Sequence, residues 1–148
     1  MKTKSGLVVA VIVIVALSAC ATQEQPVASQ ADFVAMIIDY GTAVKITGFT
    51  GGSTDIRIPS RLEGLPVTAI GPSAFARRQL TSVTIPDTVT HIGATAFWHN
   101  RLSEVAIPAG VIYIGNSAFA RNLIVRVSVP SGAHVGISAF DAGVSVVE

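Results

Sequence analysis

Few residues of this sequence have both the type and the spacing that catalysis or metal binding requires. The histidines are His91, His99 and His134, and Cys20 is the only cysteine. A single thiol cannot form an internal disulfide or a Cys-x-x-Cys metal or redox pair. The sequence also lacks a G-x-S-x-G nucleophile motif, a phosphate-binding loop and an H-E-x-x-H metal motif. We therefore expect no enzyme activity, no catalytic residue, no metal site and no cofactor.

Cys20 stands at the end of a segment that has the features of a secretion signal. Lys2 and Lys4 form a short basic start, and residues 6–17 form an apolar run. This run is too short to span a bilayer as a helix but suits the core of a signal peptide. It ends in Leu17-Ser18-Ala19-Cys20, which resembles the bacterial lipobox.

The lipobox resemblance implies that the Cys20 thiol carries a diacylglycerol and that residues 1–19 are removed as a signal peptide. Several fatty-acid chains, such as palmitate, anchor a protein stably where a single chain does not. An ordinary signal peptide with an incidental cysteine, or an uncleaved anchor, remains an alternative. We expect a cell-envelope protein held by its lipid at the outer membrane or cell surface, in preference to the cytoplasmic membrane.

Residues 20–30 are predicted to form the acylated cysteine and a flexible tether. The segment after Cys20 is polar, contains Pro26 and shows no hydrophobic periodicity. The chain as a whole has a formal charge of +1, with 13% charged and 50% hydrophobic residues. Such a small net charge gives no basic field for binding a nucleic acid.

A repeat within residues 58–140 indicates the fold. Four segments end in Ala-Phe, and their phenylalanines lie 22, 22 and 21 residues apart. Each Ala-Phe pair is preceded by an apolar residue followed by glycine. Further upstream stands a β-branched residue followed by proline. The shared string is L-x-x-V-x-I-P-x-x-V-x-x-I-G-x-x-A-F-x-x-N. The phenylalanines are Phe75, Phe97, Phe119 and Phe140.

This string resembles the BspA-like bacterial leucine-rich repeat, and the resemblance covers roughly residues 37–143. It implies a mainly β solenoid of about four repeats of roughly 22 residues over residues 31–148, without a catalytic site. Members are found largely on secreted and surface-anchored proteins and are often linked to adhesion. This chain has fewer repeats than many members, so we expect no large adhesive surface.

The residues predict the same architecture directly. Val83 and Ile85 alternate with polar residues, as in a strand with one buried face, and the pattern recurs near Val105 and Val127. Gly93 is expected to adopt a backbone angle closed to other residues, and residues 94–100 to form a helical turn. No coil can bury its own phenylalanine, so the coils must stack.

Three further structural roles are predicted. The amides of Asn100 and Asn122 should be buried and bonded to backbone groups between coils. Residues 31–49 should form an N-terminal cap hairpin that turns at residues 39–41. Residues 143–148 should form one more strand, whose apolar edge either serves as a cap or pairs with a second copy or a partner, and we favour pairing.

The repeat also aligns surface residues into columns. One column brings His91 and His134 two coils apart, about 10 Å, which is too far to share a metal ion and favours a solvated ladder. Two further columns, which mix charged, polar and small residues, lie on the first predicted strand of each repeat. The histidine column is Ala69, His91, Tyr113 and His134, and the mixed columns are Asp55, Ser82, Glu104 and Arg126, and Arg57, Thr84, Ala106 and Ser128.

The turns of the repeats are predicted to form a basic ridge around one exposed indole. A basic ridge of this kind could hold an acidic glycan or an acidic protein segment. The alternative is a solvated rim that keeps the solenoid soluble. The ridge residues are Arg77, Arg78, Trp98, His99, Arg101 and Arg121.

These features together predict a membrane-anchored lipoprotein whose solenoid mediates protein or glycan interaction or adhesion. The alternative function is a structural envelope lipoprotein that packs against other envelope components without a soluble ligand. The expected partners are the membrane, through the N-terminal lipid, and a protein or glycan.

Overall fold

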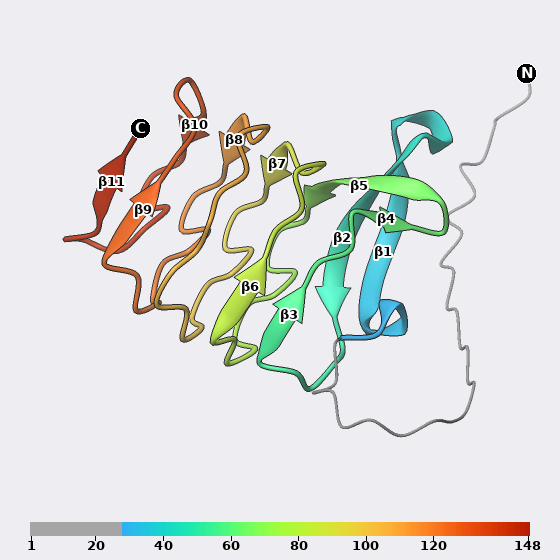
Figure 1. Cartoon of the computed structure of the whole chain (residues 1–148), viewed down its shortest axis with the longest axis horizontal. Helices are drawn as coiled ribbons and strands as arrows, with labels where there is room; N and C mark the ends of the chain where they lie inside the picture. The colour runs from blue at the N-terminus through green and yellow to red at the C-terminus, as the bar shows by residue number, and fades with distance from the viewer. Residues whose placement is uncertain (1–27) are drawn as a thin grey trace, which may run out of the picture.

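The computed structural model describes residues 28–148 as a stack of β-coils, with a hairpin at one end (Figure 1). This confirms the predicted mainly β solenoid. Within these residues there is no α-helix, and so none that could cross a membrane. The elements are η1 (Gln30–Asp32), β1 (Phe33–Ile38), η2 (Asp39–Gly41), β2 (Ala43–Phe49), β3 (Asp55–Arg57), β4 (Arg61–Leu62), β5 (Leu65–Ile70), β6 (Ser82–Thr84), β7 (His91–Ile92), β8 (Tyr113–Ile114), β9 (Arg126–Ser128), β10 (His134–Val135) and β11 (Ser145–Val147).

The predicted signal peptide, Cys20 and most of the predicted tether lie outside the described residues. The described part begins at Ala28, which packs against the core ahead of the expected domain boundary. Ser29 then caps η1: its hydroxyl accepts a hydrogen bond from the Ala31 amide, and the Asp32 carboxylate accepts one from the Ser29 amide.

The N-terminal hairpin consists of β1 and β2, which pair antiparallel. The chain reverses through η2, where Asp39, Tyr40 and Gly41 all have positive φ. Strand β2 then pairs in parallel with β5, so the hairpin forms the first layer of the stack. The predicted cap hairpin and its turn are therefore confirmed.

One sheet runs the length of the stack. Strands β5, β7, β8 and β10 follow β2 in parallel, one from each coil. The extra residues of the first repeat form β4, which pairs antiparallel with β5 through a turn at Glu63 and Gly64. The insertion therefore enlarges one coil without disturbing the order of the stack.

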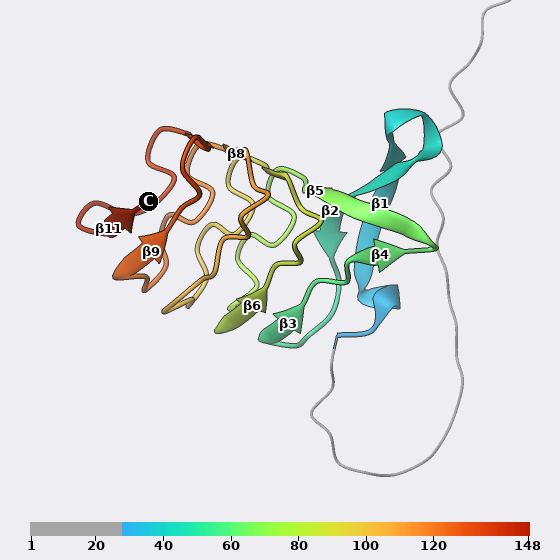
Figure 2. The same cartoon turned by 45° about the horizontal axis from the view of Figure 1, so that its top comes forward.

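The second row of strands is interrupted. Strand β3 pairs with β6 and β9 pairs with β11, both in parallel, along one side of the stack (Figure 2). Residues 104–107, where a strand was predicted around Val105, form none. Their side chains still alternate between solvent and core, so the hydrophobic pattern reported the burial correctly but not the hydrogen bonding.

A ladder of phenylalanine rings fills the core. Phe75, Phe97 and Phe119 are at most 1% exposed. The ring centroids of successive members lie 5.1 Å apart and the rings are nearly parallel. Phe140 extends the ladder at 5.3 Å from Phe119. Each ring is thus covered by its neighbours, which is why a single coil could not fold alone.

The turns that carry the phenylalanines differ from the helical turn that was predicted. The first three turns have a left-handed residue two positions before and two positions after the phenylalanine, such as Thr95 and His99 at φ 55° and 57°, whereas the fourth has only the first of these, Ser138. Gly93 is not left-handed, and that expectation was wrong. A Cβ on Gly93 would lie 2.7 Å from the backbone of Gly71 and Pro72, so glycine is needed for the close approach of two coils.

The asparagine amides bridge successive coils, as predicted. The buried Asn100 amide donates to the carbonyls of Phe75 and Phe97 and accepts from the amides of Arg78 and Leu80, at 2.9–3.1 Å. Asn122 makes three of the four equivalent bonds one coil later and is only partly buried, less than was predicted. These side chains satisfy backbone groups that the turns leave unpaired.

The segment 143–148 contains a strand, as predicted. Strand β11 lies parallel to β9 and forms the next layer of the second row. Val144 packs against the core, whereas Val146 is 48% exposed. The pairing of this segment with a second copy or a partner stays a prediction.

Candidate functional site

The turns after the phenylalanines hold the ridge residues in register. Arg77, His99 and Arg121 occupy the same left-handed position of successive turns, with φ of 57–59°. The Arg77 amide donates to the Trp98 carbonyl at 2.9 Å, and the His99 amide donates to the Ala120 carbonyl at 3.0 Å. The column is thus fixed by backbone bonds between coils.

Trp98 is the centre of this ridge. Trp98 is half-buried, whereas the sequence predicted an exposed indole. The guanidinium carbon of Arg77, from the preceding coil, lies 4.6 Å from the ring centroid, and that of Arg121, from the following coil, lies 5.4 Å away. Each such cation–π contact contributes about 0.5–1 kcal/mol at an exposed site. The indole therefore holds two exposed arginines in place.

Only part of the predicted ridge converges on the indole. The centroid of the His99 ring lies 5.2 Å from that of the Trp98 ring, so His99 is a third side chain beside the indole, after the two arginines. Arg78 and Arg101 are exposed on the same turns, where their backbone amides bond to the Asn100 side chain and the Leu80 carbonyl. They widen the basic surface, while the cation–π contacts to the indole come from Arg77 and Arg121.

Asp141 lies at the C-terminal end of the ridge and was not singled out from the sequence. Its two carboxylate oxygens accept hydrogen bonds from the backbone amides of Arg121 and Asn122, at 2.8 and 3.1 Å. The signal that could have found it is its place directly after Phe140, in the fourth turn. Because Asp141 is engaged by backbone amides, it orders the turn that carries Arg121.

The histidine column forms as predicted. Strand register places Ala69, His91, Tyr113 and His134 side by side. The Tyr113 ring stacks on His134 at 5.3 Å and lies 6.1 Å from His91. Among the described residues no group of three His, Cys, Asp or Glu side chains is placed to hold a metal ion.

The mixed columns on the second row of strands also form where pairing continues. Asp55 lies beside Ser82, Arg57 beside Thr84, and Arg126 beside Ser145. These residues are exposed and carry both charges. They offer no cluster comparable to the ridge, so the ridge is the better candidate among the predicted surfaces.

Comparison with known proteins confirms that the chain consists of leucine-rich repeats. A family model described as "BspA type Leucine rich repeat region" matches residues 51–146 in six copies. This count exceeds the four units with an Ala-Phe turn; β11 begins a further coil that lacks one. No curated protein matches the chain.

Solved structures of leucine-rich repeat proteins are similar to this chain. One from Bacteroides capillosus is 28% identical with a TM-score of 0.69, over 78% of this chain and 93% of that one. The T. pallidum leucine-rich repeat protein is 22% identical with a TM-score of 0.70, over 80% and 68%. One from Bacteroides ovatus is 21% identical with a TM-score of 0.60, over 79% and 39%.

Proposed function

The chain belongs to the BspA-type leucine-rich repeat family, and we propose that it is a lipid-anchored binding module that holds an acidic partner on its ridge. Solenoids of this kind are typical of protein-interaction modules, and no enzyme family is indicated. The partner class is an acidic protein segment or an acidic glycan.

The observation that carries this proposal is the Trp98 indole flanked by Arg77 and Arg121. A guanidinium presents paired N–H donors that match a carboxylate or a sulfate. Arginines already oriented by an aromatic ring lose less side-chain entropy on binding than free ones. Tryptophan and arginine are also the residues that most often dominate binding energy at interfaces.

The anchor is proposed at Cys20, which would carry fatty-acyl chains after removal of residues 1–19. Support comes from the Leu17-Ser18-Ala19-Cys20 string at the end of the apolar run. A lipid anchor would keep the ridge at the outer membrane or the cell surface, where an adhesive module meets its partner. The polar residues up to 27 would separate the domain from the bilayer.

A second candidate function is a structural envelope lipoprotein. It is favoured by large apolar side chains that are exposed near the C-terminal coils: Leu123 at 62%, Val125 at 74% and Ile137 at 79%. Large apolar side chains left exposed on one domain are often covered by a protein partner. In this case other envelope components would cover these residues, and no soluble ligand would be bound.

The ridge is tested by binding of the full chain, in detergent, to an oligoglutamate peptide and a uronic-acid oligosaccharide at low and high salt. The Arg77→Ala/Arg121→Ala variant should remain folded, with its stability lowered by about 1–2 kcal/mol through the loss of both cation–π contacts. It should bind at least one probe about tenfold more weakly, since two charge-assisted contacts are lost. The remaining binding should depend less on salt.

The matched control is Arg57→Ala/Arg126→Ala, which removes the same charge from the second row of strands. It should bind as the unchanged chain does. Equal weakening by both double variants would mean that net charge alone attracts the probes. Undiminished binding by the ridge variant would assign the ridge to a solvated rim.

A further inference from the structure

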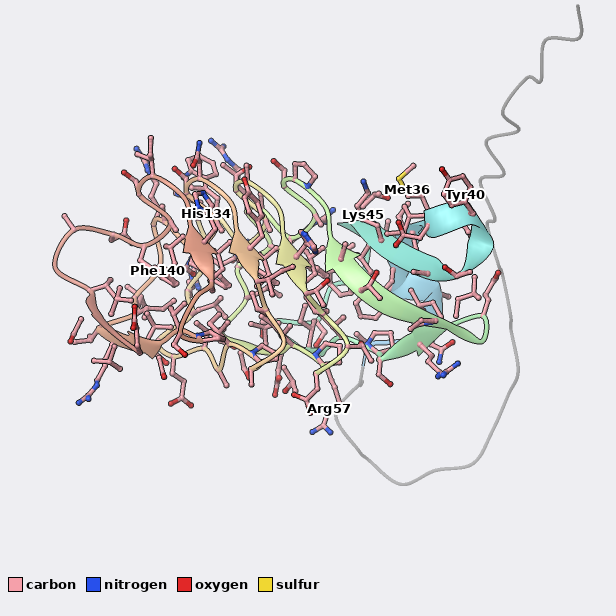
Figure 3. The ribbon with its side chains drawn as sticks, turned by 90° about the horizontal axis from the view of Figure 1, so that it is seen from above. Met36, Tyr40, Lys45, Arg57, His134 and Phe140 are labelled. Carbon is pink, nitrogen blue, oxygen red and sulfur yellow. The ribbon has the colours of Figure 1, made fainter. Side chains whose placement is uncertain are left out.

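The histidine column is missing one large side chain. Strand register continues the column to Lys45 on β2, so the order along the sheet is Lys45, Ala69, His91, Tyr113 and His134. Ala69 is the only small residue in this row. Figure 3 looks down on this face, with Lys45 on the hairpin and His134 toward the other end of the stack.

A hollow lies at the position of Ala69. It has a volume of about 520 Å³ and is open to solvent at the face of the sheet. Lys45 and His91 are one layer away from Ala69 on either side, so they are separated by two strand spacings, about 10 Å. The residues of the hollow that matter for recognition are Asp39, Lys45, Thr68, Ala69, His91 and Tyr113.

The walls of the hollow are held in place. The Thr90 hydroxyl lies 2.9 Å from Nδ1 of His91, which fixes the orientation of the imidazole. Tyr113 supports this ring from the next coil, at 6.1 Å. Ala69, only 9% exposed, lies at the bottom, where Gly71 and Gly93 also line the hollow without side chains. The floor is therefore small and apolar, and one wall is a ring.

We propose that this hollow binds a single sugar ring, which takes the place of the missing side chain in the column. Neighbouring rings lie 5.3 and 6.1 Å apart in this column and 5.1 Å apart between Phe75 and Phe97 in the core, so a guest between Lys45 and His91 would continue a similar spacing. A pyranose ring is thicker than a planar aromatic ring and fills one such interval. Its apolar C–H face would lie against His91.

The rim of the hollow suits the hydroxyl groups of a sugar. Asp39 supplies a hydrogen-bond acceptor, Lys45 a donor, and the Thr68 hydroxyl can act as either. Sugar hydroxyls need both kinds of partner. An open site with a polar rim and a small apolar floor offers them, whereas an aromatic ligand would be better served by an enclosed apolar pocket. This site shares no residue with the ridge.

The test is NMR titration of the full chain in detergent with glucose, N-acetylglucosamine and glucuronic acid at millimolar concentrations. At least one of the three sugars should shift the backbone amide resonances of residues 68–71 and 90–93. The His91→Ala variant should bind that sugar about tenfold more weakly, because it lacks the ring wall.

Two further variants complete the design. His134→Ala removes the same side chain from the same column but away from the hollow, and it should leave the binding unchanged. Ala69→Tyr fills the hollow and should abolish binding; if this variant does not fold, Lys45→Ala replaces it and should weaken binding. Absence of amide shifts with all three sugars, or equal weakening by His91→Ala and His134→Ala, would overturn the proposal.

Discussion

Phe97 is fully enclosed in the middle of the aromatic core. Its ring is 0% exposed and stacks on Phe75 and Phe119, each at a centroid distance of 5.1 Å. Truncation of a buried phenylalanine removes its apolar surface from the core and leaves a cavity, which costs about 3–5 kcal/mol. We expect Phe97→Ala to lower the free energy of unfolding by this amount, as measured by chemical denaturation.

Thr84→Ala is the comparison for this experiment, since Thr84 is exposed on β6. Its effect should stay within about 0.5 kcal/mol. If the two variants had equal denaturation midpoints, the stacked rings would not be the main source of stability.

Single residues were predicted to different degrees. The burial of Phe97 and the bridging role of Asn100 follow from the repeat, because equivalent residues must meet when the coils stack. The half-buried position of Trp98 does not follow. It depends on the guanidinium groups of Arg77 and Arg121, which are brought over the indole by left-handed backbone angles. Left-handed angles at arginine have no signal in a single sequence.

The turns between the two rows of strands depend on how closely the coils approach. At Gly93 an added Cβ would lie 2.7 Å from backbone atoms of Gly71 and Pro72, and 3.0 Å from the Ile70 carbonyl oxygen. Backbone atoms cannot move aside as a flexible side chain can, so two coils would have to separate. Gly93→Ala should therefore cost about 1–3 kcal/mol in a thermal or chemical unfolding experiment.

Gly52→Ala provides the control for this element. A Cβ at Gly52 meets nothing within 4 Å, and its φ is not in the left-handed region. The change should leave stability within about 0.5 kcal/mol of the unchanged chain. Similar losses for both variants would show that glycine is needed for its flexibility and not for close approach.

Strands were predicted correctly where side chains alternate between core and solvent and the backbone also pairs with a neighbouring strand. The period-2 pattern located β6 and β9 correctly. The same pattern around Val105 gave buried and exposed side chains in the expected order but no strand. Alternation records which side chains face the core, whereas a strand also requires a neighbour at hydrogen-bonding distance, and the sequence of one coil does not fix that distance.

At the scale of the whole molecule, the proposed anchor determines where the solenoid works. Cys20→Ser should abolish incorporation of a labelled fatty acid and release the protein from the membrane fraction, because the acyl chains have no thiol to attach to. Metabolic labelling followed by membrane fractionation measures both effects.

Ser18→Ala is the matched variant, since it keeps a small residue at that place in the string Leu17-Ser18-Ala19-Cys20. It should be labelled and fractionate as the unchanged chain does. A Cys20→Ser protein that still carries the label would contradict acylation at this residue. Release of both variants would mean that the signal region, and not the thiol, decides membrane association.

The amide of Asn100 bonds at once to its own coil, at Phe97, and to the coil before it, at Phe75. Asn122 repeats this arrangement 22 residues later. Unequal crossing-over between gene segments that encode two such coils would insert or delete a whole unit, and the new junction would contain the same donors, acceptors and ring contacts as the old ones. The length of this protein can therefore change by duplication in a single genetic event, with no new mutation needed in its core.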